Sequence, residues 1–201
     1  MDNIKYIGIT GNIGSGKSTV GKYLTNKGYF VFDSDIFVSQ IYSSKKFQDT
    51  KEKIKSLFPE CVRGKNLIKK CIKNIIFENK EKREKLEETI HPIVIEEIVN
   101  LKKKLKNNAK YKKKFAFFIV PLLYEKKLEY LFDEIWVVFT PINISIKRVI
   151  ERDKTEEKMV RKIIETQMNP LEKVKKADKV LINDKDIQAL YSQIDKLLLL
   201  M

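Results

Sequence analysis

The chain has 201 residues, of which 43% are hydrophobic and 34% are charged. This length and this balance indicate a single compact domain and exclude a disordered chain. Lys and Arg outnumber Asp and Glu by 41 to 27, which gives a net charge of +14. Such a charge can attract nucleic acid, anionic lipid or an acidic small substrate. Because the lysines are spread widely along the chain, they carry little weight as a sign of nucleic-acid binding.

The predicted elements alternate between buried strands and helices, which indicates βαβ units and a parallel sheet. A strand over residues 4–10 is followed by a helix over 19–26 and by a short strand over 29–32. The region 35–114 has helical spacing of its apolar residues, apart from an exposed loop over 107–114. Further strands are predicted over 115–120, 135–139 and 179–182, and an amphipathic helix over 187–197 closes the chain.

Two features favour a cytoplasmic protein. No apolar run reaches the ~20 residues of a membrane span, and no secretory signal is visible, although a removed organellar leader would leave the same pattern. Cys61 and Cys71 form no CxxC pair, and Cys71 lies on the apolar stripe of a predicted helix, so we expect buried, reduced thiols. The single histidine, His91, excludes a metal site built from several histidines.

A phosphate-binding loop joins the first predicted strand to the first predicted helix. Residues 11–18 read GNIGSGKS and match the pattern G-x-x-x-x-G-K-[ST] in full. Glycines let the backbone amides turn toward phosphate oxygens, which the positive end of the following helix also attracts. Lys17 would bind the β- and γ-phosphates, Ser18 would ligate Mg²⁺, and Thr19 would lie near the α-phosphate. The candidate ATP-binding residues of the loop are Gly11, Asn12, Ile13, Gly14, Ser15, Gly16, Lys17, Ser18 and Thr19.

Two carboxylates, Asp33 and Asp35, follow the second predicted strand. In open parallel sheets, ligands bind outside the carboxyl ends of the strands, so both carboxylates can face the same cleft as the phosphate loop. A carboxylate there can accept a proton from an attacking hydroxyl or hold Mg²⁺ through water. The alternative is that one of them caps the helix that begins near Ile36.

Arg148 and Arg152 are four residues apart on a predicted helix and therefore share one face. Two guanidinium groups over the transferring phosphoryl group would neutralise charge in the transition state. From spacing alone, a solvated helix face with ion pairs to Glu151 or Asp153 is favoured. Elsewhere, His91 precedes Pro92, which we expect in the first turn of a new helix.

Together these motifs resemble the dephospho-CoA kinase family over residues 7–190. The matching residues are the phosphate loop, Asp33-Ser34-Asp35, His91-Pro92, Pro121-Leu122-Leu123-Tyr124-Glu125, Arg148 to Arg152, Gln167, Ala177-Asp178 and Asn183. Members of this family phosphorylate the ribose 3′-hydroxyl of dephospho-CoA with ATP and Mg²⁺.

The resemblance implies an α/β P-loop kinase fold, in which helices flank a five-stranded parallel sheet. The core would comprise residues 1–34, 115–140 and 177–201. A helical acceptor-binding region would comprise residues 35–114, and a mobile lid would comprise residues 141–176. We expect ATP and dephospho-CoA as the small-molecule partners, with no specific nucleic acid, no membrane and no obligatory protein partner.

The resemblance also implies roles for single residues. Asp35 would be the catalytic base, and Lys17 and Arg148 would complete the catalytic group. Arg148, Arg152 and Asn183 would bind ATP, with Asn183 near the adenine. The substrate-binding residues would be Thr10, Asp33, Asp35, His91, Pro121, Leu122, Leu123 and Glu125.

The chain departs from the family pattern at two informative positions. Asn12 stands where the family usually has Gly, but Asn tolerates left-handed conformations, so we expect the loop to keep its shape. Ile119 stands where many members have Asp. Any metal role of that Asp is therefore absent or moved, and Asp33 is the candidate to replace it.

Two rival interpretations stay open. A deoxynucleoside kinase, or another small-molecule P-loop kinase, can share the sequence GNIGSGKS. Deoxynucleoside kinases normally carry Asp-Arg-Ser or Glu-Arg-Ser after a later strand, and neither triplet occurs in this chain. A basic nucleic-acid-binding ATPase would need a basic stripe and a salt-dependent affinity for nucleic acid. Neither rival accounts for as many motifs as a dephospho-CoA kinase does.

Overall fold

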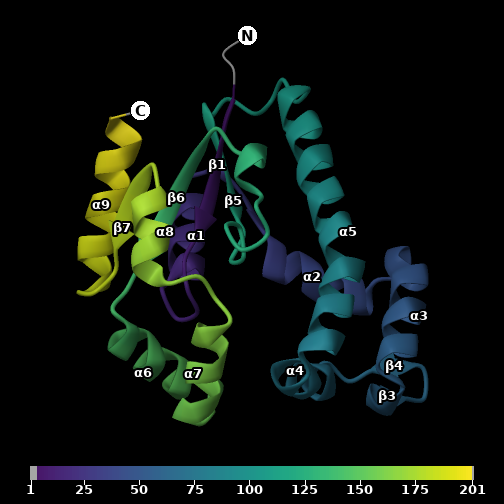
Figure 1. The fold of residues 1–201 in the computed structure, drawn as a ribbon. Coiled ribbons are helices and arrows are strands. Elements are labelled where there is room, and N and C mark those ends of the chain that lie inside the picture. Colours follow the sequence, from purple (N-terminus) through teal and green to yellow (C-terminus); the bar gives the residue numbers. More distant parts are fainter. Residues whose placement is uncertain (1–3, 201) are drawn as a thin grey trace. The chain divides into compact units, whose positions relative to one another are not determined.

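The computed structural model describes residues 4–200, shown as a ribbon in Figure 1. The chain divides into two compact units. The sheet unit comprises the described residues up to Asp33 and from Lys104 onward, and the helical unit comprises Ser34–Lys103.

Five parallel strands form the sheet of the sheet unit, and they confirm the five predicted strands to within one residue at each end. Every residue of the middle run 115–119 is buried, as expected for a parallel sheet covered on both faces. The strands are β1 (Lys5–Thr10), β2 (Phe30–Asp33), β5 (Phe115–Ile119), β6 (Glu134–Phe139) and β7 (Lys179–Ile182). Their order across the sheet is β2-β5-β1-β6-β7. The carboxyl ends of all five strands therefore lie at one edge.

Helices α1 (Lys17–Asn26) and α9 (Ile187–Leu199) cover one face of this sheet. They confirm the helices predicted over 19–26 and 187–197. Gly8 of β1 marks the other face, because a Cβ atom there would meet Leu123 and Phe132. The core between the sheet, α1 and α9 consists of Ile7, Ile9, Val20, Leu24, Phe115, Phe117, Ile119, Trp136, Val138, Leu181, Leu190 and Ile194.

The remaining helices of the sheet unit follow β5 and β6. They are η3 (Glu129–Leu131), α6 (Ile142–Asp153), α7 (Glu157–Glu165) and α8 (Pro170–Lys176). Ile146 and Val149 of α6 pack against Val160 of α7, and Figure 1 shows these two helices together in green. The residues predicted as a lid, 141–176, thus form α6, α7 and α8.

The helical unit consists of short helices, one small hairpin and most of one long helix. Its elements are α2 (Ser34–Ser43), η1 (Lys45–Phe47), α3 (Gln48–Leu57), η2 (Pro59–Cys61), β3 (Val62–Arg63), β4 (Asn66–Leu67), α4 (Lys69–Glu78) and α5 (Lys80–Lys106). The predicted loop over 107–114 is confirmed as irregular backbone after α5. Within residues 4–200, no helix is both long enough and apolar enough to span a bilayer.

The prediction that His91-Pro92 begins a new helix is wrong, because α5 runs through both residues. A proline in a helix interior costs one backbone hydrogen bond. The apolar stripe nevertheless continues across it at four-residue spacing, and all of its members are buried. Their burial offsets the lost bond and keeps the helix continuous. These residues are Leu86, Ile90, Val94 and Ile98.

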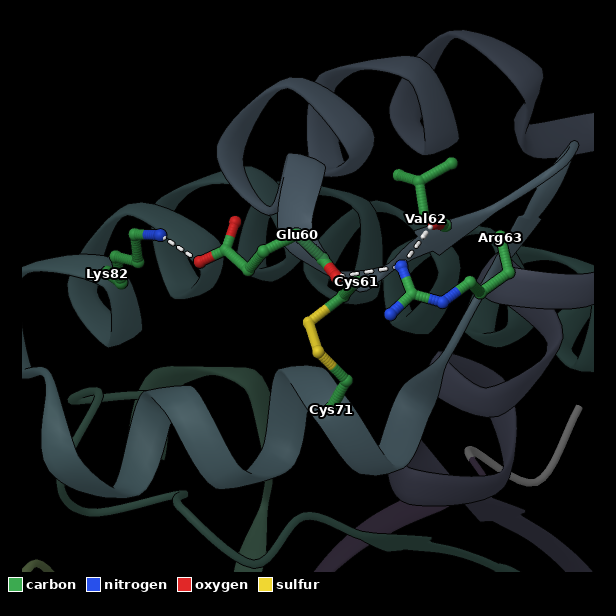
Figure 2. The surroundings of a disulfide bond; sticks show 6 residues. All are labelled: Glu60, Cys61, Val62, Arg63, Cys71 and Lys82. Atoms are coloured by element: carbon green, nitrogen blue, oxygen red, sulfur yellow. Dashed lines mark hydrogen bonds and ion pairs between the residues drawn. A yellow bond between two sulfur atoms is a disulfide. The ribbon is translucent and has the colours of Figure 1, made fainter.

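The prediction of reduced thiols is also wrong, because Cys61 and Cys71 form a disulfide bond (Figure 2). The β3–β4 hairpin, which turns at Gly64 with a φ of +59°, brings the chain back on itself. The backbone N–H of Ile68 then donates to the carbonyl oxygen of Cys61, and Cys71 lies in the first turn of α4. The two Cα atoms are 5.4 Å apart, within the range that a disulfide spans. Spacing along the sequence could not reveal this hairpin.

Candidate active site

Two glycines shape the phosphate loop. Gly16 precedes α1 with a φ of +98°, and a Cβ atom there would lie 2.1 Å from Nδ2 of Asn183. Gly14 has a φ of +75°, and a Cβ atom there would lie 2.6 Å from the carbonyl oxygen of Ser145. Residues with a side chain rarely adopt either of these backbone conformations, so both positions require glycine. The loop leads directly into the N-terminus of α1, which attracts anions.

The side chain of Lys17 folds back over the loop. Its Nζ donates to the carbonyl oxygens of Gly11, at 2.8 Å, and Asn12, at 2.9 Å. The ammonium group is thus held where phosphate oxygens of a nucleotide would meet it. Ser18 is exposed in the same helical turn. An exposed hydroxyl beside a phosphate site is a suitable oxygen ligand for Mg²⁺, which keeps several waters of its own.

Asn183 and Arg148, two predicted ATP-binding residues far apart in sequence, meet beside this loop. Asn183 is buried, and its Nδ2 donates to the carbonyl oxygen of Ser15 at 2.8 Å. The Arg148 guanidinium donates to the carbonyl oxygen of Asn183 at 3.1 Å. The Thr140 hydroxyl lies 3.0 Å from the Ser15 oxygen and 2.9 Å from the Asn183 oxygen. The ends of β6 and β7 therefore hold the loop and orient a guanidinium group next to it.

Arg152 does not join this group. It is exposed, and its Nε and a terminal nitrogen donate to the two carboxylate oxygens of Asp153, at 2.6 and 2.8 Å. This pairing raises the pKa of Arg152. The solvated helix face considered for the two arginines thus describes Arg152 and does not describe Arg148.

A second segment, at Gln167 and Met168, holds the other side of the loop. The backbone N–H of Ile13 donates to Oε1 of Gln167 at 2.9 Å, and Nδ2 of Asn12 donates to the carbonyl oxygen of Met168 at 3.0 Å. Asn12 has no left-handed backbone conformation. Instead, its side chain makes a hydrogen bond that a glycine at this position could not make.

Two polar side chains of the predicted substrate side, Thr10 and Glu125, bond within the protein. The Thr10 hydroxyl donates to the carbonyl oxygen of Pro121 at 2.9 Å. Oε1 of Glu125 accepts the Met168 N–H at 2.8 Å and pairs with Nζ of Lys173 at 2.9 Å. Leu123 is fully buried, whereas Leu122 is partly exposed.

Lys173 is a residue that the sequence did not reveal. It lies in a run of lysines on α8, yet it is completely buried, while the neighbouring Leu171 is 59% exposed. Hydrophobic spacing would predict the opposite arrangement, so no pattern could have identified it. Burial lowers the pKa of the Lys173 ammonium, and the hydrogen bond and ion pair with Glu125 oppose this shift.

The remaining predicted residues lie on β2 and in the helical unit. Asp33 ends β2, and its Cα is in register with Ile119 of β5. Neighbours in register point to the same face of a sheet, and the Ile119 side chain lies where a Cβ on Gly21 of α1 would fall. Asp33 is therefore a carboxylate on the same face of the sheet and at the same level as Ile119 of the neighbouring strand. Asp35 lies in the first turn of α2, and His91 lies midway along α5.

The family model described as dephospho-CoA kinase matches residues 5–189. The dephospho-CoA kinase of Fusobacterium nucleatum is 40% identical over 196 residues, covering 96% of this chain and 97% of that protein. A crystal structure from Thermus thermophilus superposes with a TM-score of 0.80 at 31% identity, over 99% of this chain and 98% of its own. The structure of the dephospho-CoA kinase from Campylobacter jejuni superposes with a TM-score of 0.62 at 25% identity, over 97% of this chain and 96% of its own. The chain therefore belongs to the dephospho-CoA kinase family.

Proposed function

We propose that the protein transfers the γ-phosphoryl group of ATP to the ribose 3′-hydroxyl of dephospho-CoA, giving coenzyme A and ADP. One observation carries the proposal: a complete phosphate loop, contacted by Asn183 and flanked by Arg148, in a chain that matches the family along almost its whole length. The loop supports a nucleotide as phosphoryl donor. The family match supports dephospho-CoA as acceptor.

Lys17, the loop amides and Arg148 would stabilise the transferring group. Phosphoryl transfer depends mainly on positioning and on neutralising the charge that spreads over the γ-phosphate. Lys17 is already held over the loop by two carbonyl oxygens. Arg148 presents a planar fork, of which one nitrogen is 3.1 Å from the Asn183 carbonyl oxygen. In the proposed reaction this fork would bind oxygens of the transferring phosphoryl group.

Asp35 is the proposed base for the 3′-hydroxyl. Asp35 follows Asp33 by two residues, and two residues of extended chain span about 7 Å at most. It therefore lies close to the carboxyl end of β2, the edge of the sheet where ligands of parallel sheets bind. An oxygen that attacks the γ-phosphate must lose its proton, and a carboxylate can accept it.

Mg²⁺ is the proposed cofactor, and it would enter with ATP. Among residues 4–200 there is no group of three His, Cys, Asp or Glu side chains able to hold a metal. This fits a magnesium ion held mainly by phosphate oxygens and water, with the Ser18 hydroxyl as a protein ligand. Asp33, which stands beside Ile119 in the sheet, would bind one of those waters. The ion would neutralise charge on the β- and γ-phosphates.

The acceptor would bind to residues 35–114, with His91, Pro121, Leu122 and Glu125 on the substrate side. Residues 141–176 would act as the lid. We propose no specific nucleic acid, membrane or obligatory protein partner, and we propose a cytoplasmic enzyme. The Cys61–Cys71 disulfide bears on that location, because disulfides are rare in reducing compartments. Alkylation of thiols in intact cells would show whether the two cysteines are reduced there.

The function is tested by measuring ADP release with dephospho-CoA beside a panel of deoxynucleosides. With ATP as donor, we expect rapid, Mg²⁺-dependent turnover with dephospho-CoA and with no other acceptor of the panel. The product should co-migrate with authentic coenzyme A. Lys17→Ala is the control that separates this turnover from a contaminating kinase. Comparable turnover with a deoxynucleoside, or none with dephospho-CoA, would overturn the proposal.

A further inference from the structure

Helix α8 buries a charged side chain that the proposed chemistry does not use. The side chain of Lys173 is 0% exposed, and that of its partner Glu125 is 14% exposed. Removing two charges from water costs free energy that their mutual attraction often fails to return. A buried pair of this kind is therefore poorly explained by stability alone, so its contacts need to be followed.

On one side, Lys173 bonds to Pro121, which follows β5 and is itself bonded to the end of the strand that leads into the phosphate loop. Its Nζ lies 3.2 Å from the carbonyl oxygen of Pro121, which also accepts the hydroxyl hydrogen bond of Thr10. Thr10 is the last residue of β1, and Gly11 follows it as the first residue of the loop. The ammonium group and the Thr10 hydroxyl thus share one acceptor directly beneath the start of the loop.

On the other side, Lys173 is linked through Glu125 to the Gln167–Met168 segment, which bonds to the loop. Its partner Glu125 accepts the Met168 N–H, and the carbonyl oxygen of Met168 accepts from the side chain of Asn12. Gln167, one residue earlier, accepts the N–H of Ile13. Each step is a hydrogen bond of 2.8–3.0 Å between groups of the sheet unit.

We propose that Lys173 is a positioning residue for the nucleotide. Together with Glu125, it fixes the Gln167–Met168 segment against Asn12 and Ile13, and so it sets the shape of the phosphate loop. It acts through these residues and does not touch the nucleotide itself. The inference rests on the proposed ATP-dependent function and adds to it a charged pair that controls the nucleotide side of the site.

The test replaces the whole pair, because removing one partner would leave an uncompensated buried charge. Lys173→Met with Glu125→Gln keeps the side-chain volumes and keeps an oxygen that can accept the Met168 N–H. The matched control is Lys176→Met with Glu129→Gln, an ion pair of 3.5 Å between α8 and the neighbouring turn whose side chains are 50% and 36% exposed. Melting midpoint, ATP dissociation constant and KM for both substrates are measured for each variant.

We expect the buried-pair variant to fold with a melting midpoint close to that of the unmodified protein. Its affinity for ATP should fall by about 10- to 100-fold, since a displacement of about 1 Å in a site can have effects of this size. Because Glu125 also lies on the proposed acceptor side, the ATP dissociation constant measured without acceptor decides the test, and its rise should exceed any rise in KM for dephospho-CoA. The exposed-pair variant should match the unmodified protein in every measurement.

Two outcomes would overturn the inference: unchanged ATP affinity in the folded buried-pair variant, or a loss of kcat that follows the folded fraction while both KM values stay constant. If the pair variant fails to fold, Lys173→Arg, which keeps the charge but moves the donor atoms, is examined by hydrogen exchange of residues 11–15. Faster exchange there supports the inference, and unchanged exchange refutes it. ATP binding is measured without acceptor, so a failure with dephospho-CoA would refute the proposed substrate and leave this test intact.

Discussion

Different interactions stabilise the interior of the sheet unit and the interior of the helical unit. In the sheet unit, parallel strands enclose large buried side chains such as Phe117 and Trp136, and hydrogen bonds from distant segments converge on the phosphate loop. In the helical unit, short helices are joined by the Cys61–Cys71 disulfide and by exposed ion pairs such as Lys82 with Glu60 (Figure 2). Exposed ion pairs stabilise proteins little. The cross-link therefore matters more to the helical unit than any ion pair does.

This difference suggests a division of labour between the two units. A nucleotide site needs a fixed geometry, and strands with many distant partners supply it. Short helices with few buried residues open more easily, and regions that bind substrates or move are often of this kind. Changes that act on one unit at a time test this difference.

The largest expected effect comes from the first turn of the helical unit. Asp35→Asn keeps the side-chain size and removes the proposed base. A positioned base is typically worth about 10²–10⁴ in rate, so kcat should fall by that factor. The affinity for Mg·ATP should stay within a few-fold, because the phosphate loop and Lys17 belong to the sheet unit. Steady-state kinetics with dephospho-CoA give both quantities.

Asp33→Asn is the matched control, since Asp33 is two residues away but ends a strand of the sheet unit. It should shift the Mg²⁺ dependence of turnover more than the limiting rate. Near-normal kcat in Asp35→Asn, together with a large loss in Asp33→Asn, would move the role of base to the sheet unit. The helical unit would then have no catalytic residue in the proposed mechanism.

Breaking the disulfide should affect the helical unit selectively. The bridge closes a loop over a sequence separation of 10 residues. A disulfide that closes a loop of this length typically stabilises the folded protein by about 2–4 kcal/mol. Adding a dithiol reductant should therefore accelerate hydrogen exchange in residues 59–78 and leave β1, β5 and β6 unchanged. Glu60→Gln, which removes an exposed ion pair of the same region, should change exchange far less.

Uniform acceleration across both units would contradict the division proposed above. Unchanged exchange in residues 59–78 would show that the hairpin and α4 hold their places without the cross-link. A Cys71→Ser variant distinguishes loss of the bridge from other effects of the reductant, because it should be insensitive to the reductant.

The two units also differ in how far their structure follows from sequence. Strands of the sheet unit can be predicted to within one residue because apolar runs such as 115–120, which lies between a lysine run and Pro121, are buried on both faces. The phosphate loop follows from its motif, since few other sequences can adopt its backbone. In the helical unit, the break between α2 and α3, the β3–β4 hairpin and the course of α5 through Pro92 depend on burial and turns that spacing does not encode.

The candidate site shows the same limit at the level of single residues. Lys17, Asn183 and Arg148 belong to recognisable sequence motifs, and the structure brings them together beside one loop. Arg152 lies one helical turn from Arg148 in the sequence, and yet it pairs with its neighbour Asp153. Lys173 carries no motif, because only the folded chain distinguishes a buried lysine from a solvated one.

A smaller effect tests the sheet unit through its ligand. Mg·ATP at 100 times its dissociation constant should stabilise the protein by about 2.7 kcal/mol. For a chain of this length, that corresponds to a rise in melting midpoint of about 5–11 °C. Lys17→Ala should abolish most of the rise while changing the midpoint of the free protein little. An equal rise in both proteins would place the nucleotide elsewhere. Hydrogen exchange should show the protection in β1, α1 and residues 11–18.

The smallest expected effect concerns a carboxylate at the start of β6. Glu134 is buried, pairs with Lys5 and accepts a hydrogen bond from Nε1 of Trp136 at 2.6 Å. Burial raises the pKa of the Glu134 carboxyl, but the bonds to Lys5 and Trp136 outweigh it and lower the pKa below the ordinary value of 4.5. A carboxylate with a lowered pKa stabilises the fold above its unfolded pKa, and this stability is lost as the pH falls through the folded pKa.

Glu134→Gln tests this contribution, because the amide oxygen can still accept the Trp136 hydrogen bond while the charge is lost. Since Lys5 is 41% exposed, the variant should be less stable at pH 7 by about 1 kcal/mol or less. Urea unfolding at a series of pH values should show this difference shrinking as the pH falls below the ordinary value of 4.5 and the unmodified carboxylate becomes protonated. Glu129→Gln, in the exposed pair with Lys176, should show a smaller difference at every pH. A difference for Glu134→Gln that stays constant down to pH values well below its pKa would mean that the amide packs poorly and that charge is not its cause. The stability of the sheet unit would then rest on its apolar core alone at this edge, which would make its contrast with the helical unit sharper.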